Sequence, residues 1–132
     1  GDDLAAEFDE ELEDDEVHRF TIRDGDRTVG LIQFGEEEDP DYRHGLLDIY
    51  IDPTAHRCGY AHDAIATLVN HLFDERGHHR LTIDPSADNA PAIARHRGIG
   101  FRPVGVMRSY EQREGGTWGN GLLMELLASE RI

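Results

Sequence analysis

The sequence predicts a mixed α/β domain, an α+β fold in which helices pack on both faces of a mixed central sheet. Short segments of alternating apolar and polar residues indicate strands, and a longer segment with apolar residues three and four apart indicates a helix. The predicted order β-β-β-α-β-α-β-β sets helices between strands, which is typical of a partly parallel sheet. A chain of 132 residues has room for one such core.

The first half of the chain is expected to supply three strands. Residues 17–23 alternate between apolar and polar side chains and end at an Asp-Gly pair, which is a hairpin signal. Residues 28–34 would form the returning strand. Residues 46–51 would form a third strand, which an Asp-Pro pair closes.

The second half is expected to alternate helices with strands. Residues 60–73 have helical spacing, and Gly77 follows as a stop signal. The remaining expected elements are a buried strand at 80–83, a short helix at 89–97 opened by Asn and Pro, and a final strand pair at 101–110 and 118–127.

The acidic segment 1–16 precedes the domain expected at 17–132. Leu4, Phe8 and Leu12 recur every four residues, which makes one apolar stripe on a helix. The segment is therefore interpreted as a docked helix, with an acidic tail as the alternative.

The charge balance restricts the partners. The chain has 28 acidic and 13 basic residues, a formal net charge of −15, and such a field repels nucleic acid and anionic membranes. It favours cationic partners such as polyamines, aminosugars or basic peptides, although acidity can also serve solubility alone. No apolar run approaches the roughly 20 residues that span a bilayer, and the single Cys58 suits a reducing, cytoplasmic compartment.

Two further polar clusters have simple interpretations. The acidic run 36–41 is predicted to be a loop, either solvated or placed to meet a cationic ligand. His71, His78 and His79 lie near Asp74, but their spacing matches no closed ligand set, so no metal site is expected.

The loop between the third strand and the long helix has the features of a phosphate site. A loop that runs straight into a helix aims unpaired N–H groups outward, where the helix dipole also favours an anion. Small residues let a pyrophosphate approach the backbone. The loop residues are His56, Arg57, Cys58, Gly59, Tyr60 and Ala61.

Residues 83–101 join three polar groups in a short stretch. Asp84 follows a buried strand, Asn89 opens the short helix and His96 lies on that helix. Because open α/β sheets bind ligands at the carboxyl ends of their strands, these side chains are expected to share a crevice.

The same stretch carries a family resemblance. The run from Thr82-Ile83-Asp84-Pro85-Ser86 through Ala92-Ile93 to Gly100-Phe101 resembles the aminoglycoside 6′-N-acetyltransferases of the GCN5-related N-acetyltransferase superfamily. Their usual form is Asp-Pro-x-x-x-Asn, then Ala-Ile, then Tyr-x-Lys-x-Gly-Phe. The resemblance covers roughly residues 17–127, and the core at 46–101 carries most of its weight.

The resemblance implies an acetyl-CoA site between two splayed strands. Tyr50 and Ile51 would offer backbone groups to the pantetheine arm, and residues 56–61 would hold the pyrophosphate. Asn89 would bond the pantetheine or the neighbouring backbone. The implied function is transfer of an acetyl group to an amine of a cationic small molecule, of the kind that aminoglycoside-resistance enzymes modify.

The acceptor side would be acidic. Asp48 lies among apolar residues of the third strand, where a buried acid is costly without a partner. It would bind an ammonium and accept its proton, unless it is a salt-bridged or edge-facing residue. Asp84 would bind a second amine or cap the turn with Pro85. His96 would act as a substitute acid near the leaving thiolate, or face solvent on its helix.

Several positions depart from the family pattern. His56, Arg57 and Ala61 replace the usual Gln or Arg and two glycines, while His96 replaces Tyr and Gly98 replaces Lys. A strand and helix that usually open the fold are expected to be missing or trimmed. The alternatives are therefore acetylation of a protein N-terminus, a lysine or a siderophore precursor, and a non-catalytic protein that binds acyl-CoA or cations. A monomer or homodimer is expected.

Overall fold

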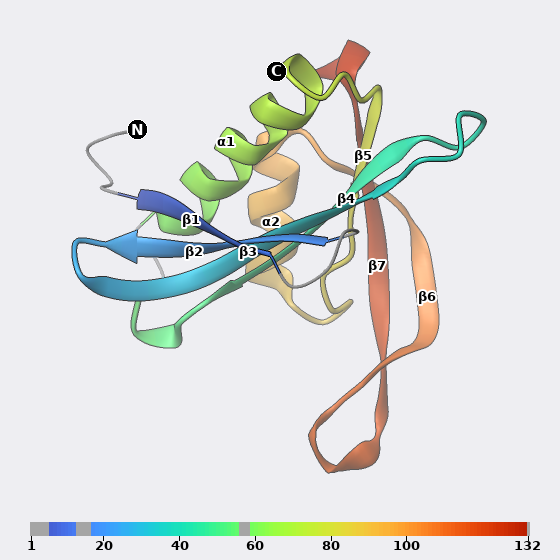
Figure 1. Cartoon of the computed structure of the whole chain (residues 1–132). Coiled ribbons are helices and arrows are strands. Elements are labelled where there is room, and N and C mark those ends of the chain that lie inside the picture. Colours follow the sequence, from blue (N-terminus) through green and yellow to red (C-terminus); the bar gives the residue numbers. More distant parts are fainter. Residues whose placement is uncertain (1–5, 13–16, 56–58, 132) are drawn as a thin grey trace.

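A single twisted sheet with two helices makes up the described part of the chain, which in the computed structural model is residues 6–12, 17–55 and 59–131 (Figure 1). The strand order in the described sheet is β1-β2-β3-β4-β5-β7-β6. The elements are β1 (Ala6–Leu12), β2 (Val17–Asp24), β3 (Arg27–Glu37), β4 (His44–Ile51), α1 (Tyr60–Asp74), β5 (Arg80–Ile83), α2 (Ala90–Ile99), β6 (Arg102–Gln112) and β7 (Trp118–Leu127). The mixed α+β class and the predicted order from residue 17 onward are confirmed.

The N-terminal segment is a strand and not a helix. Residues 6–12 pair antiparallel with β2, in a register that joins Ala6 to Asp24 and Leu12 to His18. A spacing of four residues places side chains on one side of a helix, but four is also a multiple of the two-residue period of a strand. The stripe at Leu4, Phe8 and Leu12 therefore fitted either element, and the free edge of β2 provides the partner that favours a strand.

Both described helices lie on the same face of the sheet, which corrects the expectation of helices on both faces. Each follows one parallel strand and leads to the next, from β4 through α1 to β5 and from β5 through α2 to β6. Both crossovers move in the same direction along the sheet, and such connections are almost always right-handed, so both helices fall on one side. In Figure 1, α2 lies next to α1, and the two helices are in contact.

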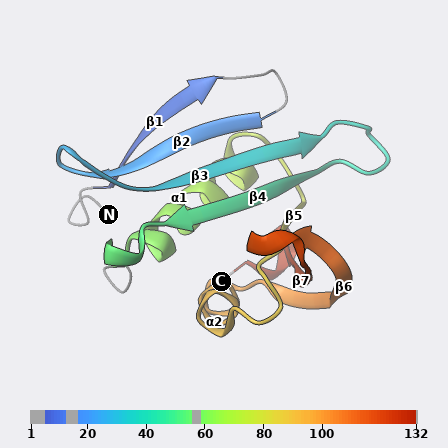
Figure 2. The same cartoon turned by 90° about the horizontal axis from the view of Figure 1, so that it is seen from below.

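The core lies between this face and the helices. In β3 and β4, the pairs Ile32–Ile49 and Phe34–Leu47 point toward α1, while the pairs Leu31–Tyr50 and Gln33–Asp48 point to the other face. Leu31 and Tyr50 are accordingly exposed. Asp48 therefore belongs to the face that the described helices leave uncovered (Figure 2).

Strands β4 and β5 pair over a short distance only. Their parallel ladder joins Gly45 to Leu81, Leu46 to Thr82 and Leu47 to Ile83, where β5 ends. Strand β4 continues for four residues to Ile51. Its edge from Asp48 onward has no strand beside it in the described sheet, and a wedge opens there.

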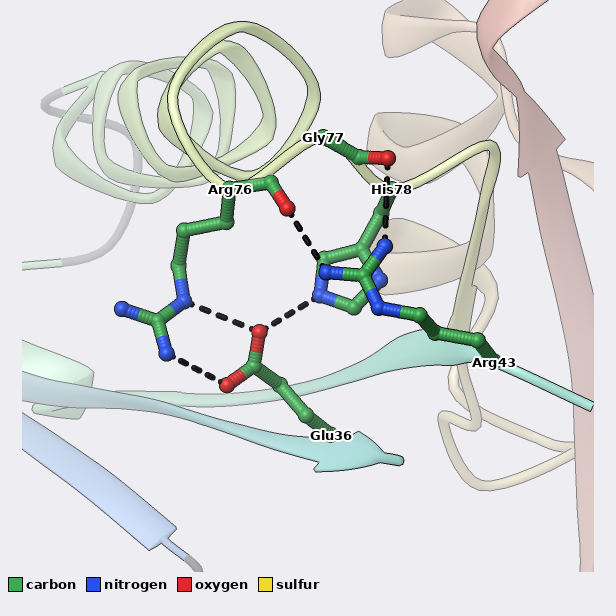
Figure 3. A network of polar contacts seen from close by, with 5 residues as sticks. All are labelled: Glu36, Arg43, Arg76, Gly77 and His78. Carbon is green, nitrogen blue, oxygen red and sulfur yellow. Dashed lines mark hydrogen bonds and ion pairs between the residues drawn. The ribbon is translucent and has the colours of Figure 1, made fainter. Parts of the chain in front are cut away.

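A network of ionic contacts fixes the opposite end of this strand pair. Glu36 accepts two hydrogen bonds from the Arg76 guanidinium, at 2.9 and 2.6 Å, and contacts Nε2 of the buried His78 at 2.6 Å (Figure 3). Arg43 donates to the carbonyl oxygens of Arg76 and Gly77. The network binds the β3–β4 connection to the segment that follows α1.

This network corrects the interpretation of the acidic run at 36–41. Glu36 and Glu37 belong to strand β3, so the loop is shorter than predicted. The carboxylate of Glu36 is held by Arg76 and His78, so the ion pairs occupy the group that was expected to be solvated or to meet a ligand. The arginine holds the pKa of Glu36 down to about 2, even though partial burial acts in the opposite direction.

Candidate active site

The wedge between β4 and β5 opens into a cavity of about 480 Å³. The end of β4, the turn after β5 and the first turns of α2 form its walls, and one residue of β6 closes it. The polar and charged residues that line it are Asp48, Tyr50, Asp84, Ser86, Asn89, Arg95, His96 and Glu111.

The cavity brings together six of the residues predicted from the sequence. Asp48, Tyr50 and Ile51 come from β4, Asp84 from the turn after β5, and Asn89 and His96 from α2. The crevice expected for Asp84, Asn89 and His96 is thus present. Of the predicted phosphate loop, His56, Arg57 and Cys58 lie outside the described residues.

The rest of that loop borders a second cavity of about 360 Å³. Gly59, Tyr60 and Ala61 line it together with Ile51 and Arg95. Gly59 precedes α1 with a φ of 83°, a left-handed conformation that favours glycine. The first backbone N–H groups of a helix have no partner within it, so this end of α1 favours an anion.

Asp48 is more basic than an ordinary aspartate. Loss of hydration raises its pKa, and the nearby carboxylates of Asp84 and Glu111 raise it further. Although the side chain is exposed on the open face of the sheet, it sits in the concave wall of the cavity, where other atoms displace much of its water. A carboxylate in this setting binds a proton or a cation more readily than one on an open surface.

Asp84 is held by an aromatic hydroxyl. The Tyr110 hydroxyl donates a hydrogen bond to Oδ2 of Asp84. This hydrogen bond raises the pKa of Tyr110 to about 12, with smaller contributions from burial and from the charges of Asp48 and Glu111. The phenol therefore remains a neutral donor over the whole range in which proteins work.

Glu111 is a site residue that sequence reasoning missed. It lines the cavity, and the Ser86 hydroxyl donates a hydrogen bond to its Oε1. The pairing of β6 with β7 is irregular between Met107 and Glu111, and Ser109 has a φ of 48°. Such a bulge changes the side to which later residues point, so no alternating pattern in the sequence identifies Glu111.

His96 is buried, which corrects the alternative of a solvent-facing helix residue. Its side chain lies with an edge against the Phe101 ring, the residue is 2% exposed, and Nδ1 has no hydrogen-bond partner in the described chain. Burial lowers its pKa to about 4, and the charge of Arg95 adds to the effect. The ring is therefore neutral at pH 7, which argues against a role as a protonated acid.

Asn89 has a structural task in addition to its place in the cavity. Its side-chain oxygen accepts a hydrogen bond from the Ala92 N–H at 3.3 Å and caps α2, with Pro91 in the first turn. The capping oxygen faces the helix, which leaves the amide NH₂ as the donor that can reach into the cavity.

A protein-family model matches most of the chain. Residues 1–101 match the model of the Acetyltransferase (GNAT) family, which is more than three quarters of the chain. The chain belongs to the GNAT family of acetyltransferases. This GNAT protein is matched by no curated protein. Membership confirms the superfamily and the acetyltransferase class expected from the sequence.

Solved structures show the same fold at low sequence identity. A chimera of the spermidine N-acetyltransferase SpeG from Vibrio cholerae and hSSAT is 21% identical, with a TM-score of 0.77, over 89% of this chain and 70% of that one. RimJ of Mycobacterium smegmatis, in complex with CoA-disulfide, is 24% identical, with a TM-score of 0.79, over 87% of this chain and 55% of that one. The chain thus spans little more than half the length of RimJ.

None of the described helices is long and apolar enough to cross a membrane. Within the same residues, no group of three or more His, Cys, Asp or Glu side chains is arranged to hold a metal ion. His78 instead contacts Glu36, and Nδ1 of His71 contacts Glu75.

Proposed function

We propose that this GNAT protein transfers the acetyl group of acetyl-CoA to an amine of a small molecule with several positive charges. One observation carries the proposal: a single cavity joins the open edge of β4 to the three carboxylates of Asp48, Asp84 and Glu111. A thioester held along β4 and an amine held by the carboxylates would meet in that cavity.

The residues present fit acetyl-CoA. The part of β4 at Tyr50 and Ile51, beyond its ladder with β5, would offer backbone groups to the amides of a pantetheine arm, and Asn89 lines the same cavity. The start of α1 at Gly59 offers N–H groups to a phosphate. When bound, acetyl-CoA supplies a reactive thioester, and the cavity holds it in line with the amine.

The carboxylates would bind and deprotonate the acceptor. An amine reaches the cavity as an ammonium, which must lose a proton before it can attack a carbonyl carbon. Burial raises the pKa of Asp48, and the neighbouring Asp84 and Glu111 raise it further, so Asp48 would take up that proton more readily than an isolated aspartate. Asp84 and Glu111 would hold other ammonium groups of the same molecule.

His96 would act as a neutral hydrogen-bonding group. With a pKa near 4, the imidazole cannot supply a proton as an imidazolium at pH 7. The ring is fixed against Phe101, and its unpartnered Nδ1 offers the wall of the wedge one polar contact. We assign His96 to positioning of the thioester arm, which replaces the acid role expected from the family position.

The acceptor that we propose first is an aminoglycoside, because the segment 82–101 resembles the 6′-N-acetyltransferases of that group. A linear polyamine is the second candidate, since several solved structures of the same fold are forms of one spermidine N-acetyltransferase, that of Vibrio cholerae. Both acceptors carry several ammonium groups a few atoms apart, which suits three carboxylates that share a cavity.

A thiol-release assay tests the function. Purified protein is incubated with acetyl-CoA and, separately, an aminoglycoside, spermidine, a basic peptide and a catechol-type amine that represents a siderophore precursor, and free CoA is measured. Turnover with an aminoglycoside or spermidine supports the proposal and identifies the acceptor class. Turnover with the peptide or catechol amine alone would show that the acceptor is of that class and would overturn the proposed acceptors. Tight acetyl-CoA binding without any turnover would indicate a non-catalytic binding protein.

A further inference from the structure

Arg95 occupies the point where the two cavities of the site meet. It lies on α2, one residue before His96, and lines both the wedge and the cavity at the start of α1. Ile51 is the one other described residue that lines both. The guanidinium is therefore within reach of a molecule that runs from the wedge to the first turn of α1.

Arg95 has no partner in the described chain. No hydrogen bond or ion pair joins it to another described residue, although it is partly buried and loss of hydration lowers its pKa. Other arginines behave differently: Arg76 is paired with Glu36, Arg113 with Asp88 and Arg131 with Asp74. In a chain with 28 acidic residues, a half-buried arginine without a carboxylate is costly unless an anion completes it.

The surroundings of Arg95 suit an anion. The second cavity is bordered by the small residues Ala55, Gly59 and Ala61, so a bulky ligand group can approach the backbone. The start of α1 borders the same space, and the positive end of the helix dipole favours an anion there. The adjoining wedge contains His96, which is 2% exposed and has an unpartnered Nδ1, a second polar group that awaits a ligand.

Charge is thus separated across the two adjoining cavities. Asp48, Asp84 and Glu111 lie at one end, and Arg95 lies toward the other. A ligand with an anionic tail and an uncharged reactive end can bind in one direction only, with its tail away from the carboxylates.

We propose that Arg95 binds the diphosphate of CoA and thereby sets both the affinity and the direction of the cofactor. The proposal rests on the proposed function, because it assumes CoA as the ligand. A planar guanidinium with several N–H donors matches phosphate oxygens in two-point contacts, which backbone N–H groups at the helix start then complete.

Calorimetric titration tests this assignment without reference to turnover. CoA, dephospho-CoA and pantetheine are each titrated into the wild-type protein, Arg95→Ala, Arg95→Lys and Arg97→Ala. Arg97 lies two residues away on the same helix, is exposed and lines neither cavity, so its variant is the matched control. Circular dichroism and thermal melting verify that each variant is folded.

The expected result is specific to the diphosphate. Arg95→Ala should lower the affinity for CoA and dephospho-CoA by at least about tenfold, since a charge-assisted contact to phosphate is lost. The affinity for pantetheine should stay unchanged. Arg95→Lys should recover part of the affinity, Arg97→Ala should match wild type, and the affinity of Arg95→Ala should depend less on salt.

Other outcomes overturn the assignment in distinguishable ways. An equal loss for all three ligands would make Arg95 a packing residue of the wedge, and a loss for CoA alone would place it on the 3′-phosphate. Unchanged CoA affinity in Arg95→Ala would refute the inference while the proposed function stands. A wild-type protein that binds none of the three ligands would refute both.

Discussion

The hydroxyl of Tyr110 donates a hydrogen bond to Oδ2 of Asp84, and this bond ties β6 to the turn that follows β5. The contact spans 26 residues of sequence and holds one of the three carboxylates of the cavity in place. The outer hairpin thus helps to position a side chain that lines the cavity, although β6 lies at the edge of the described sheet.

Loss of this bond should lower stability modestly. Tyr110→Phe removes a donor to a charged group that is partly exposed, so we expect the free energy of unfolding to fall by about 1 kcal/mol. Urea unfolding measures the change. Tyr42→Phe is the control, because Tyr42 is 71% exposed and its hydroxyl has no described hydrogen bond. Equal effects of the two variants would mean that the Tyr110–Asp84 bond contributes nothing.

Replacement of Asp48 should slow the reaction and leave cofactor binding unchanged. For Asp48→Asn we expect kcat/KM for the amine to fall roughly a hundredfold or more, as is typical when a general base is lost. The affinity for CoA should stay the same. Asp26→Asn changes the charge equally in an exposed turn and should have wild-type kinetics. Near-normal turnover by Asp48→Asn would exclude this residue as the base.

Binding of the acceptor should also depend on Glu111. Glu111→Gln keeps the shape of the side chain and its bond partner Ser86, but removes one charge from the cavity. We expect KM for a multiply charged amine to rise several-fold, with a smaller effect on a monoamine, because fewer charges are held. Steady-state kinetics with spermidine and propylamine check this. The same change in KM for both amines would contradict the assignment.

The Glu36 network should stabilise the fold in a pH-dependent way. The pKa of Glu36 falls from 4.5 to about 2 on folding, so the stabilisation is complete above pH 4.5 and is lost as the pH falls through 2. Glu36→Gln should cost about 2 kcal/mol at pH 7, and the cost should shrink toward pH 2. Urea unfolding at pH 7 and pH 3 tests this, with the exposed Glu38→Gln as control. A cost that does not vary with pH would show that the charge of Glu36 is unimportant.

His96 should destabilise the folded state in mild acid. The unfolded chain takes up a proton here below pH 6.5, whereas the folded ring stays neutral down to about pH 4. Wild-type stability therefore falls between these values, and His96→Phe should gain roughly 1–2 kcal/mol over wild type between pH 7 and pH 5. The exposed His79→Gln, the control, should show no such gain in urea unfolding. If the difference in unfolding free energy between His96→Phe and wild type were the same at pH 7 and pH 5, His96 would be accessible to protons in the folded protein.

Most of the fold could be predicted because its signals are local. Alternation identified β2, turn signals bounded β3 and β4, and helical spacing identified α1. The helix α2 continues two residues beyond the expected end, to Gly100 with its φ of 123°. The segment at 6–12 could not be assigned, because a four-residue repeat suits strand and helix alike. The placement of both helices on one face depends on the direction of the crossovers, which requires the strand order.

The candidate site was predicted where neighbours in sequence are also neighbours in space. Asp84, Asn89 and His96 lie within 13 residues of each other and share the cavity. The burial of His96 could not be predicted, because its helix has no clear apolar face and Phe101, which packs against it, belongs to the segment after the helix. Glu111 was missed because a bulge, which the alternation does not show, changes the side to which it points.

The short ladder between β4 and β5 has a consequence for the thermodynamics of the site. Since β5 stops at Ile83 while β4 runs on to Ile51, the opening is determined by strand length and is present before any ligand arrives. The cost of leaving backbone amides without a neighbouring strand is therefore part of the free energy of folding. A molecule that enters the wedge meets no closed ladder that it must break. The amides of such a molecule would take the place of the missing strand beside β4.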